Sequence, residues 1–160
     1  MFPERLSKNF TTHELVRSYI ATKHGLDNTP PDELLPNARR LVALLEEART
    51  IIGRTFGHEI AFDISSGYRS EPVNTKARGA RNSAHKRFRA ADGTFRGVST
   101  ELAFKALAKS KLAFDKLILE RDEDSIWIHI QIAEEGEQPA RKAFTAVRDE
   151  KGTTYKAWQP

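Results

Sequence analysis

The chain has 160 residues, a length that suits one domain with a single hydrophobic core. Hydrophobic residues make up 39% of it and charged residues 30%, so intrinsic disorder is excluded. Without cysteine, disulfides and thiolate metal ligands are excluded too. No apolar run approaches the roughly 18 residues of a membrane span, and the first residues lack the apolar core of a secretory signal. We therefore expect synthesis in the cytoplasm, with some other route to any site of action outside it.

The net charge of +4 favours a polyanionic partner, either nucleic acid or an anionic cell wall. A surface with slightly more basic than acidic side chains accounts for the same charge equally well. The basic residues are not spread evenly, however, and this local excess is more informative than the total. Five of them stand within one short segment: Arg78, Arg81, Lys86, Arg87 and Arg89.

The first part of the chain predicts helices. Thr11 and Glu14 fit a capping box, and the apolar face that follows predicts one helix that ends near Gly25. The strongest helical stripe covers residues 37–52, and Gly53 is expected to end that helix.

The second part of the chain predicts a sheet, which makes the fold class α+β. Residues 60–64 alternate between apolar and polar, as a strand does. Residues 71–92 are polar, basic and rich in small side chains, and we interpret them as a long functional loop with a short helix inside. The remaining predicted elements are a helix over residues 100–109 with Ser99 as its N-cap, and two hairpins, 114–120 with 126–132 and 143–149 with 153–158.

Three residues suggest a metal site. His85 and Asp92 stand seven positions apart in the predicted loop, and His129 lies near the end of a predicted strand. Two imidazoles and one carboxylate form the ligand set of a catalytic zinc site, which keeps one position open for water. Taken alone, a histidine and an aspartate at this spacing arise often by chance. We predict that the three residues bind Zn²⁺.

The pairing of two strands places a carboxylate near this site. Every second residue of the strand around His129 is isoleucine, so His129 points to the opposite face. Burying those isoleucines together with the leucines of the preceding strand requires a register such as Leu119 opposite Ile128. That register sets Glu120 opposite Trp127, on the face that carries His129, about 7–8 Å away at the backbone.

A zinc hydrolase needs a carboxylate in such a place. The metal lowers the pKa of its water towards ~7, and a nearby base takes the proton and passes it to the leaving amine. Glu123 and Asp124 are also close to His129 in sequence, but they lie in the predicted turn, where acidic residues are usually solvated. We predict Glu120 as the base and keep these two as alternatives.

Arg69 is a candidate for binding substrate. It follows a predicted strand through a Ser-Gly-Tyr turn. A guanidinium binds a carboxylate through two hydrogen bonds, or stabilises charge that builds on a scissile carbonyl. The alternative is a structural salt bridge, which composition alone favours.

Five motifs in one order resemble a known family. They are Ser-Gly-Tyr-Arg-Ser at 66–70, Asn-Ser-Ala-His at 82–85, Ala-Ala-Asp at 90–92, Phe-Asp-Lys-Leu-Ile-Leu-Glu at 114–120 and Trp-Ile-His at 127–129. Together they resemble the zinc D-alanyl-D-alanine carboxypeptidases, a family that includes phage L-alanyl-D-glutamate endolysins. The resemblance extends upstream to residues 6–11 and 28–30 and includes the closing hairpin, so it covers nearly the whole chain.

The resemblance implies a single zinc peptidase domain over residues 1–160. Its fold would be the D-Ala-D-Ala peptidase-like (hedgehog-type) fold, with a small antiparallel sheet and N-terminal helices packed on it. The implied activity is hydrolysis of peptide bonds in peptidoglycan stems or cross-links. The implied site residues are the zinc ligands His85, Asp92 and His129, with Arg69 at the substrate. We add Ser83 and Trp127, which stand within two of the motifs, as substrate-binding residues.

The chain departs from the family pattern at two positions. The family usually has glycine three residues after the first ligand histidine, where this chain has Phe88. A phenylalanine there is expected to narrow the cleft or shift the loop, and so to affect substrate choice. Some members place the catalytic acid three residues before the last histidine, where this chain has Ile126. The base must then come from elsewhere, which agrees with Glu120.

We therefore expect a monomeric zinc peptidase that cuts peptidoglycan. It would be a lysis enzyme or a tail-associated enzyme of a phage or prophage. It would act at the bacterial cell wall after release or as part of a phage particle, with stem peptides as its partner and no nucleic acid. One alternative is a non-catalytic cell-wall-binding or phage structural protein on the same fold. The other is a basic nucleic-acid-binding domain, but the sequence offers no recognition helix or stacking platform for it.

Overall fold

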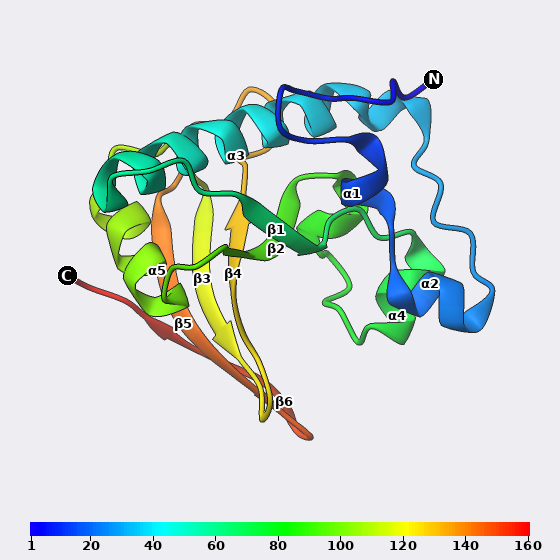
Figure 1. Ribbon diagram of the computed structural model, residues 1–160. Helices are drawn as coiled ribbons and strands as arrows, with labels where there is room; N and C mark the ends of the chain where they lie inside the picture. The colour runs from blue at the N-terminus through cyan, green and yellow to red at the C-terminus, as the bar shows by residue number, and fades with distance from the viewer.

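A six-stranded sheet organises the fold in the computed structural model, which describes residues 1–160 (Figure 1). Its order is β1-β2-β4-β3-β5-β6, and every neighbouring pair is antiparallel except β3 and β5, which are parallel. The predicted antiparallel sheet is therefore correct only in part. The strands are β1 (Phe62–Ser66), β2 (Ala90–Phe95), β3 (Lys116–Arg121), β4 (Ile126–Gln131), β5 (Lys142–Asp149) and β6 (Gly152–Ala157).

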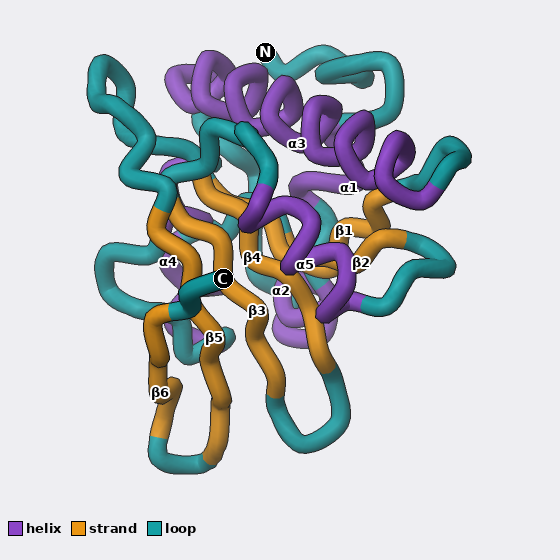
Figure 2. The backbone as a smooth tube through the Cα atoms, turned by 90° about the vertical axis from the view of Figure 1, so that its left-hand side faces the viewer, coloured by secondary structure: helices purple, strands orange, loops and turns teal.

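Helices lie on both sides of this sheet. In Figure 2, α5 lies in front of β3 and β4, α3 crosses above them, and α4 lies behind the sheet. None of the helices combines the length and the apolar character that crossing a lipid bilayer requires. The helices are α1 (Thr12–Val16), α2 (Tyr19–His24), α3 (Leu35–Phe56), α4 (Glu71–Lys76) and α5 (Thr100–Lys109), with short 3-10 helices at Asp32–Leu34 and Ala84–Arg87.

The hairpin of β3 and β4 has the predicted register. Leu119 pairs with Ile128 and Leu117 with Ile130, and all four side chains are buried in the core. Because side chains alternate along a strand, the other face of both strands turns away from α5. Glu120 pairs with Trp127 on that second face, as predicted.

The predicted first helix is in fact two. The capping box of Thr11 and Glu14 is confirmed, but α1 ends at Val16, and Ser18 caps α2 by accepting from the backbone N–H of Ala21 at 3.2 Å. The break frees the carbonyl of Leu15, which would otherwise stay within the helix. It accepts instead from the backbone N–H of Tyr68 at 2.7 Å, and so ties α1 to the segment that follows β1.

The predicted end of α3 at Gly53 is wrong. The helix continues to Phe56 and ends at Gly57, whose φ of 83° is left-handed. Gly53 serves a close approach instead, because a Cβ there would lie 3.0 Å from the backbone oxygen of His58 as the chain turns back. The predicted helix at residues 100–109 is confirmed as α5, with Ser99 as its cap.

The interpretation of residues 71–92 as a long loop with a short helix inside is correct only in part. The segment contains α4 and a 3-10 helix, and it ends within β2, which is inserted between β1 and β4. This strand lacks an alternating pattern because nearly all of its residues are buried. Gly93 is required there, since a Cβ would clash with the backbone oxygen of Asp63 on β1.

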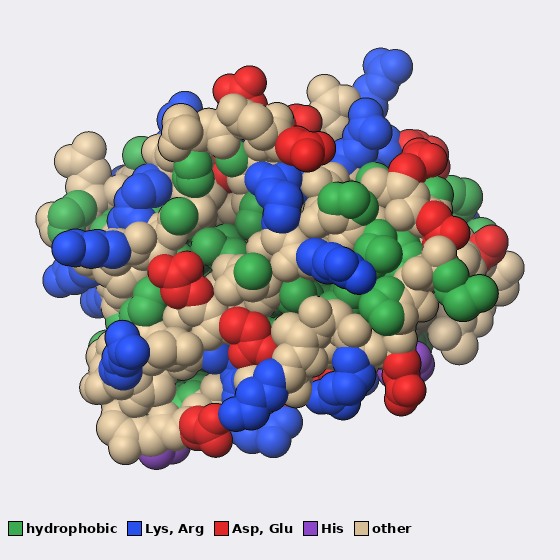
Figure 3. Space-filling model, turned by 90° about the horizontal axis from the view of Figure 1, so that it is seen from above, with side chains coloured by type: hydrophobic (Ala, Val, Ile, Leu, Met, Phe, Trp, Pro, Cys, Tyr) green, Lys and Arg blue, Asp and Glu red, His purple; other side chains and the backbone are tan.

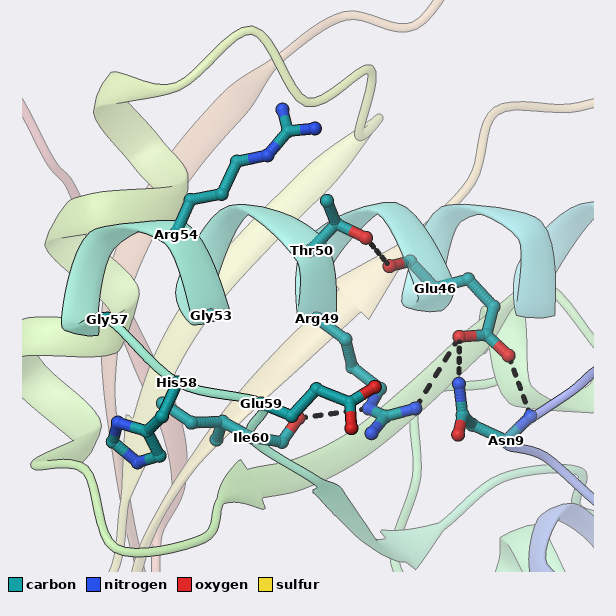
Figure 4. Close-up of a pocket in the computed structure, with 10 residues that line it drawn as sticks. All are labelled: Asn9, Glu46, Arg49, Thr50, Gly53, Arg54, Gly57, His58, Glu59 and Ile60. Carbon is teal, nitrogen blue, oxygen red and sulfur yellow. Dashed lines mark hydrogen bonds and ion pairs between the residues drawn. The ribbon is translucent and has the colours of Figure 1, made fainter.

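A half-buried carboxylate ties the N-terminal segment to α3 (Figure 4). Glu46 accepts hydrogen bonds from the Ser7 hydroxyl at 2.6 Å and from the backbone and side chain of Asn9 at 2.8 and 2.7 Å. Burial favours the neutral acid, but these hydrogen bonds outweigh it and lower the pKa of Glu46. The pocket beside Glu46 along α3 is therefore part of the contact between the N-terminal segment and this helix. Over the face above α3, acidic and basic side chains are interspersed (Figure 3).

Phe88 belongs to the core. Its side chain is fully buried, and its ring stacks on Phe2 and on Tyr68 with centroids 5.5 Å apart in both cases. Its φ of 56° is left-handed, a conformation that glycine adopts more readily than any other residue. The expectation that Phe88 narrows a cleft is wrong, because the ring points into the interior.

Replacing Phe88 by glycine should destabilise the protein in spite of relieving this backbone. Loss of a buried aromatic side chain costs about 3–5 kcal/mol, and release of the left-handed strain returns about 1–2 kcal/mol. We expect Phe88→Gly to lower the free energy of unfolding in urea by about 1–4 kcal/mol. Phe88→Leu, which keeps the strain and much of the apolar volume, should lose less. An unchanged or higher stability of the glycine variant would contradict this account of the stacking.

Candidate metal centre

The three predicted ligands lie together. His85 comes from the 3-10 helix Ala84–Arg87, Asp92 from β2, and His129 from β4, where it pairs directly with Asp92. Each offers one ligand atom, and these atoms all lie within 4.8 Å of one another. All three side chains are buried. Residues far apart in the chain thus form one compact cluster.

The outer nitrogen of each imidazole faces an acceptor. Nδ1 of His85 donates to the carbonyl of Gly67 at 2.6 Å, and Nε2 of His129 lies 3.3 Å from the amide oxygen of Gln131. The inner nitrogens, Nε2 of His85 and Nδ1 of His129, face the Asp92 carboxylate at 3.2 and 2.8 Å. Metal-binding histidines usually hold their second nitrogen in this way.

The donor set fits a divalent cation such as zinc. Burial lowers the pKa of His85, which favours a neutral ring with a lone pair on its inner nitrogen. That lone pair and an oxygen of Asp92 then face each other, and two acceptors in contact repel unless a cation lies between them. Imidazole nitrogen and carboxylate oxygen are both common ligands of zinc.

The charges of the cluster support one another. Burial acts to raise the pKa of the Asp92 carboxyl, but its contacts with His85 and His129 outweigh it and hold that pKa well below its usual range. Burial acts to lower the pKa of His129, but the hydrogen bond and charge of Asp92 outweigh it and raise that pKa. Asp92 is therefore an ionised carboxylate in the interior, which is what a cation site requires.

Arg69 lies at the cluster and forms a salt bridge there. Its Nη2 is 3.0 Å from the second oxygen of Asp92, and its Nε donates to the hydroxyl of Ser66 at 2.9 Å. The structural alternative raised from sequence is thus present. Arg69 also lines the cleft beside the cluster, so the ion pair does not remove it from the site.

Glu120 stands at the same cleft, one strand away from His129. Burial, and then the negative charge of Asp92, raise the pKa of its carboxyl. Glu123 and Asp124 lie in the exposed turn between β3 and β4 and do not line the cleft. Of the three carboxylates considered from sequence, Glu120 is the one that the fold brings to the cluster.

The cleft has a volume of about 340 Å³, and its floor is the second face of the sheet. Ser83 and Trp127 line it, as expected of substrate-binding residues, whereas Phe88 does not. Sequence reasoning missed the wall contributed by β3, β5 and β6, because the parallel pairing of β3 with β5 joins strands that are not consecutive. The one available signal was the spacing of Phe144 and Arg148, which are four residues apart and so point to the same face of their strand. The missed wall residues are Lys116, Ile118, Phe144, Arg148, Thr153 and Tyr155.

The basic segment noted in the sequence contributes little to this cleft. Arg89 is buried, bonded to Glu134 at 2.7 Å and to the carbonyl of Ile132 at 3.2 Å. Lys86 forms an ion pair with Glu71. Within that segment, Arg78 lines the cleft.

Residues 8–131 match a known protein family, Peptidase M15. The chain belongs to the Peptidase M15 family. The match covers most of the chain and includes the metal cluster and Glu120, while β5 and β6 lie beyond it. M15 peptidases are zinc-dependent, in agreement with the donor set, and the family confirms the resemblance seen in the motifs. No curated protein matches the sequence.

Gly67 links this M15 cluster to the packing of α1, because its carbonyl holds His85 and its Cα lies against the backbone of Leu15. A Cβ at position 67 would clash with the carbonyl oxygen of Leu15, so Gly67→Ala must shift the acceptor of His85. We expect this variant to melt at a lower temperature and to bind zinc more weakly, measured by calorimetry on the metal-free protein. Gly97→Ala is the control: it adds a Cβ at an exposed residue with a left-handed φ of 75° outside the cleft, so it should cost some stability but leave zinc affinity unchanged. Unchanged zinc affinity in Gly67→Ala would show that His85 does not depend on this carbonyl.

Proposed function

We propose that this M15 peptidase is a zinc enzyme that hydrolyses peptide bonds in bacterial peptidoglycan, as a cell-wall-lysing or remodelling enzyme of phage or prophage origin. The observation that carries the proposal is the buried cluster of His85, Asp92 and His129 at the floor of a cleft that also holds Glu120. A fold retained only for wall binding would have no need of such a buried cluster.

The roles proposed for the residues follow from their places. A zinc ion held by His85, Asp92 and His129 would supply a Lewis acid that polarises the scissile carbonyl and makes water more acidic. Glu120 takes a proton from the attacking water and delivers it to the leaving amine. A raised pKa suits a group that must hold the proton between the two steps, because such a carboxylate accepts a proton more readily than an ordinary one.

The cleft also suits an anionic peptide. Arg69 is placed to bind a substrate carboxylate or to stabilise charge on the scissile carbonyl, with Ser83 and Trp127 as further contacts. Peptidoglycan stems carry free carboxylates, so a basic wall favours them. The basic side chains that line the cleft are Arg69, Arg78, Lys116 and Arg148.

The wider setting is part of the same proposal. We propose a monomer with one zinc peptidase domain of the hedgehog-type fold, which acts at the cell wall after release or within a phage particle, independently of nucleic acid. Digestion of purified peptidoglycan by the zinc-loaded protein, with the released ends identified by mass spectrometry, tests the activity. New amino and carboxyl termini in the stem peptides are expected. If the peptidoglycan stays intact after incubation with the zinc-loaded protein, the proposed activity is refuted, and the alternative of a non-catalytic wall-binding protein is favoured.

Loss of any one of the three ligands should weaken zinc binding severely, because a site with two remaining side-chain ligands holds the ion poorly. We expect His85→Ala, Asp92→Ala and His129→Ala to purify with less than one zinc per chain, measured by atomic emission. His58→Ala, which removes an exposed histidine far from the cluster, should keep the wild-type content. Full zinc content in all three ligand variants would refute the assignment.

Glu120→Gln should remove most of the turnover and leave zinc bound. Glutamine keeps the shape of the side chain but cannot take a proton, and a positioned acid–base group is worth roughly 10²–10⁴-fold in rate. The rate of peptide release from peptidoglycan is the measurement. Glu123→Gln and Asp124→Asn, which remove acids from the turn of the same hairpin, should retain activity. Activity lost in either of these and kept in Glu120→Gln would place the base in the turn.

A further inference from the structure

A chain of hydrogen bonds runs from His129 through Gln131, at the edge of the cleft, to Asp115. Nε2 of His129 lies 3.3 Å from the amide oxygen of Gln131, and the amide nitrogen of Gln131 donates to Oδ2 of Asp115 at 3.2 Å. The other oxygen of Asp115 accepts from the backbone N–H of Ala140 at 3.1 Å. Gln131 and His129 are both buried, two residues apart on the same face of β4.

The polarity of this chain is set at its far end. An ionised carboxylate only accepts hydrogen bonds, and a backbone N–H only donates. Asp115 therefore requires Gln131 to present its NH₂ group, which turns the amide oxygen towards His129. That oxygen in turn requires a proton on Nε2 of the ring. In a neutral ring the lone pair then lies on Nδ1, the nitrogen that faces Asp92 at 2.8 Å.

The two histidines differ in how their orientation is fixed. The acceptor of His85 is the backbone carbonyl of Gly67, which is an acceptor whatever its neighbours are. The acceptor of His129 belongs to a side-chain amide, which can turn over and offer a donor instead. Gln131 alone thus leaves the ring state of His129 undecided, and Asp115 decides it. A backbone bond from the N–H of Asp115 to the carbonyl of Gln131, at 2.8 Å, holds the two residues in place.

We propose that Asp115 and Gln131 are positioning residues that select the tautomer of His129 whose Nδ1 is free to bind zinc. The inference rests on the proposed zinc site but goes beyond it, because it assigns a role to two residues that are not members of the ligand cluster. Asp115→Asn should reverse the donor and acceptor roles along these hydrogen bonds. The introduced amide would keep its oxygen on the N–H of Ala140 and present its NH₂ to Gln131, so the Gln131 amide turns and places a donor against Nε2.

The experiment measures zinc affinity by competition with a chelator, on metal-free protein, for the wild type, Asp115→Asn, Gln131→Glu and the double variant. Outer-shell changes of this kind cost about 10–100-fold in metal affinity, and we expect that loss for Asp115→Asn. Gln131→Glu sets two carboxylates against each other and should also bind zinc more weakly. In the double variant, the introduced amide donates to the introduced carboxylate, which in turn accepts from His129, so most of the affinity should return.

Asp122→Asn is the matched control, because its carboxylate also accepts from backbone N–H groups, of Asp124 and Ser125, but in the exposed turn of the β3–β4 hairpin. It should bind zinc as the wild type does. Recovery of zinc affinity in the double variant supports the proposed chain of hydrogen bonds, since two independent structural defects would lower the affinity further. Wild-type affinity in Asp115→Asn, or a double variant no better than the weaker single one, would overturn the inference. A wild type that binds zinc tightly but leaves peptidoglycan intact would overturn the proposed function and leave this inference standing.

Discussion

The pairing of β3 with β4 is the constraint on which the rest of the site depends. With Leu117 and Leu119 opposite Ile130 and Ile128, one face of the hairpin is buried against α5, and each such side chain contributes about 1.5–3 kcal/mol. A slip of one residue would turn these side chains to the cleft and the polar ones to the core. The same hydrophobic burial that stabilises the fold therefore orients His129 and its neighbours, and no separate interaction is needed to select the catalytic face.

The metal cluster concentrates charge in the interior, which is costly unless every charge has a partner. Asp92 meets most of this condition through its own chain, because Arg69 and His129 lie against its oxygens. The third ligand, His85, is held from its outer nitrogen by the Gly67 carbonyl. Such an arrangement keeps the ligands in place in the metal-free protein, so the site is formed in advance by the fold.

Patterns with a local physical cause were predictable from the sequence. The capping box at Thr11, the helix after Ser99 and the register that places Glu120 all follow from short-range spacing. Features that depend on distant partners were not. The break after α1 depends on an acceptor needed by Tyr68, and β2 lacks alternation because both of its faces are buried. The cleft wall on β5 and β6 depends on a parallel pairing that no local pattern reports.

Connectivity sets the order in which the centre assembles during folding. The β3–β4 and β5–β6 hairpins are each closed by a short turn, so they form over few residues. Asp92 reaches His129 across 37 residues of chain, and the loop-closure entropy of that contact is larger. The two ligands meet only when β2 is inserted between β1 and β4. Uptake of a metal ion in a refolding experiment thus reports the completed sheet. A chain in which both hairpins have formed but β2 is still unpaired would take up no metal.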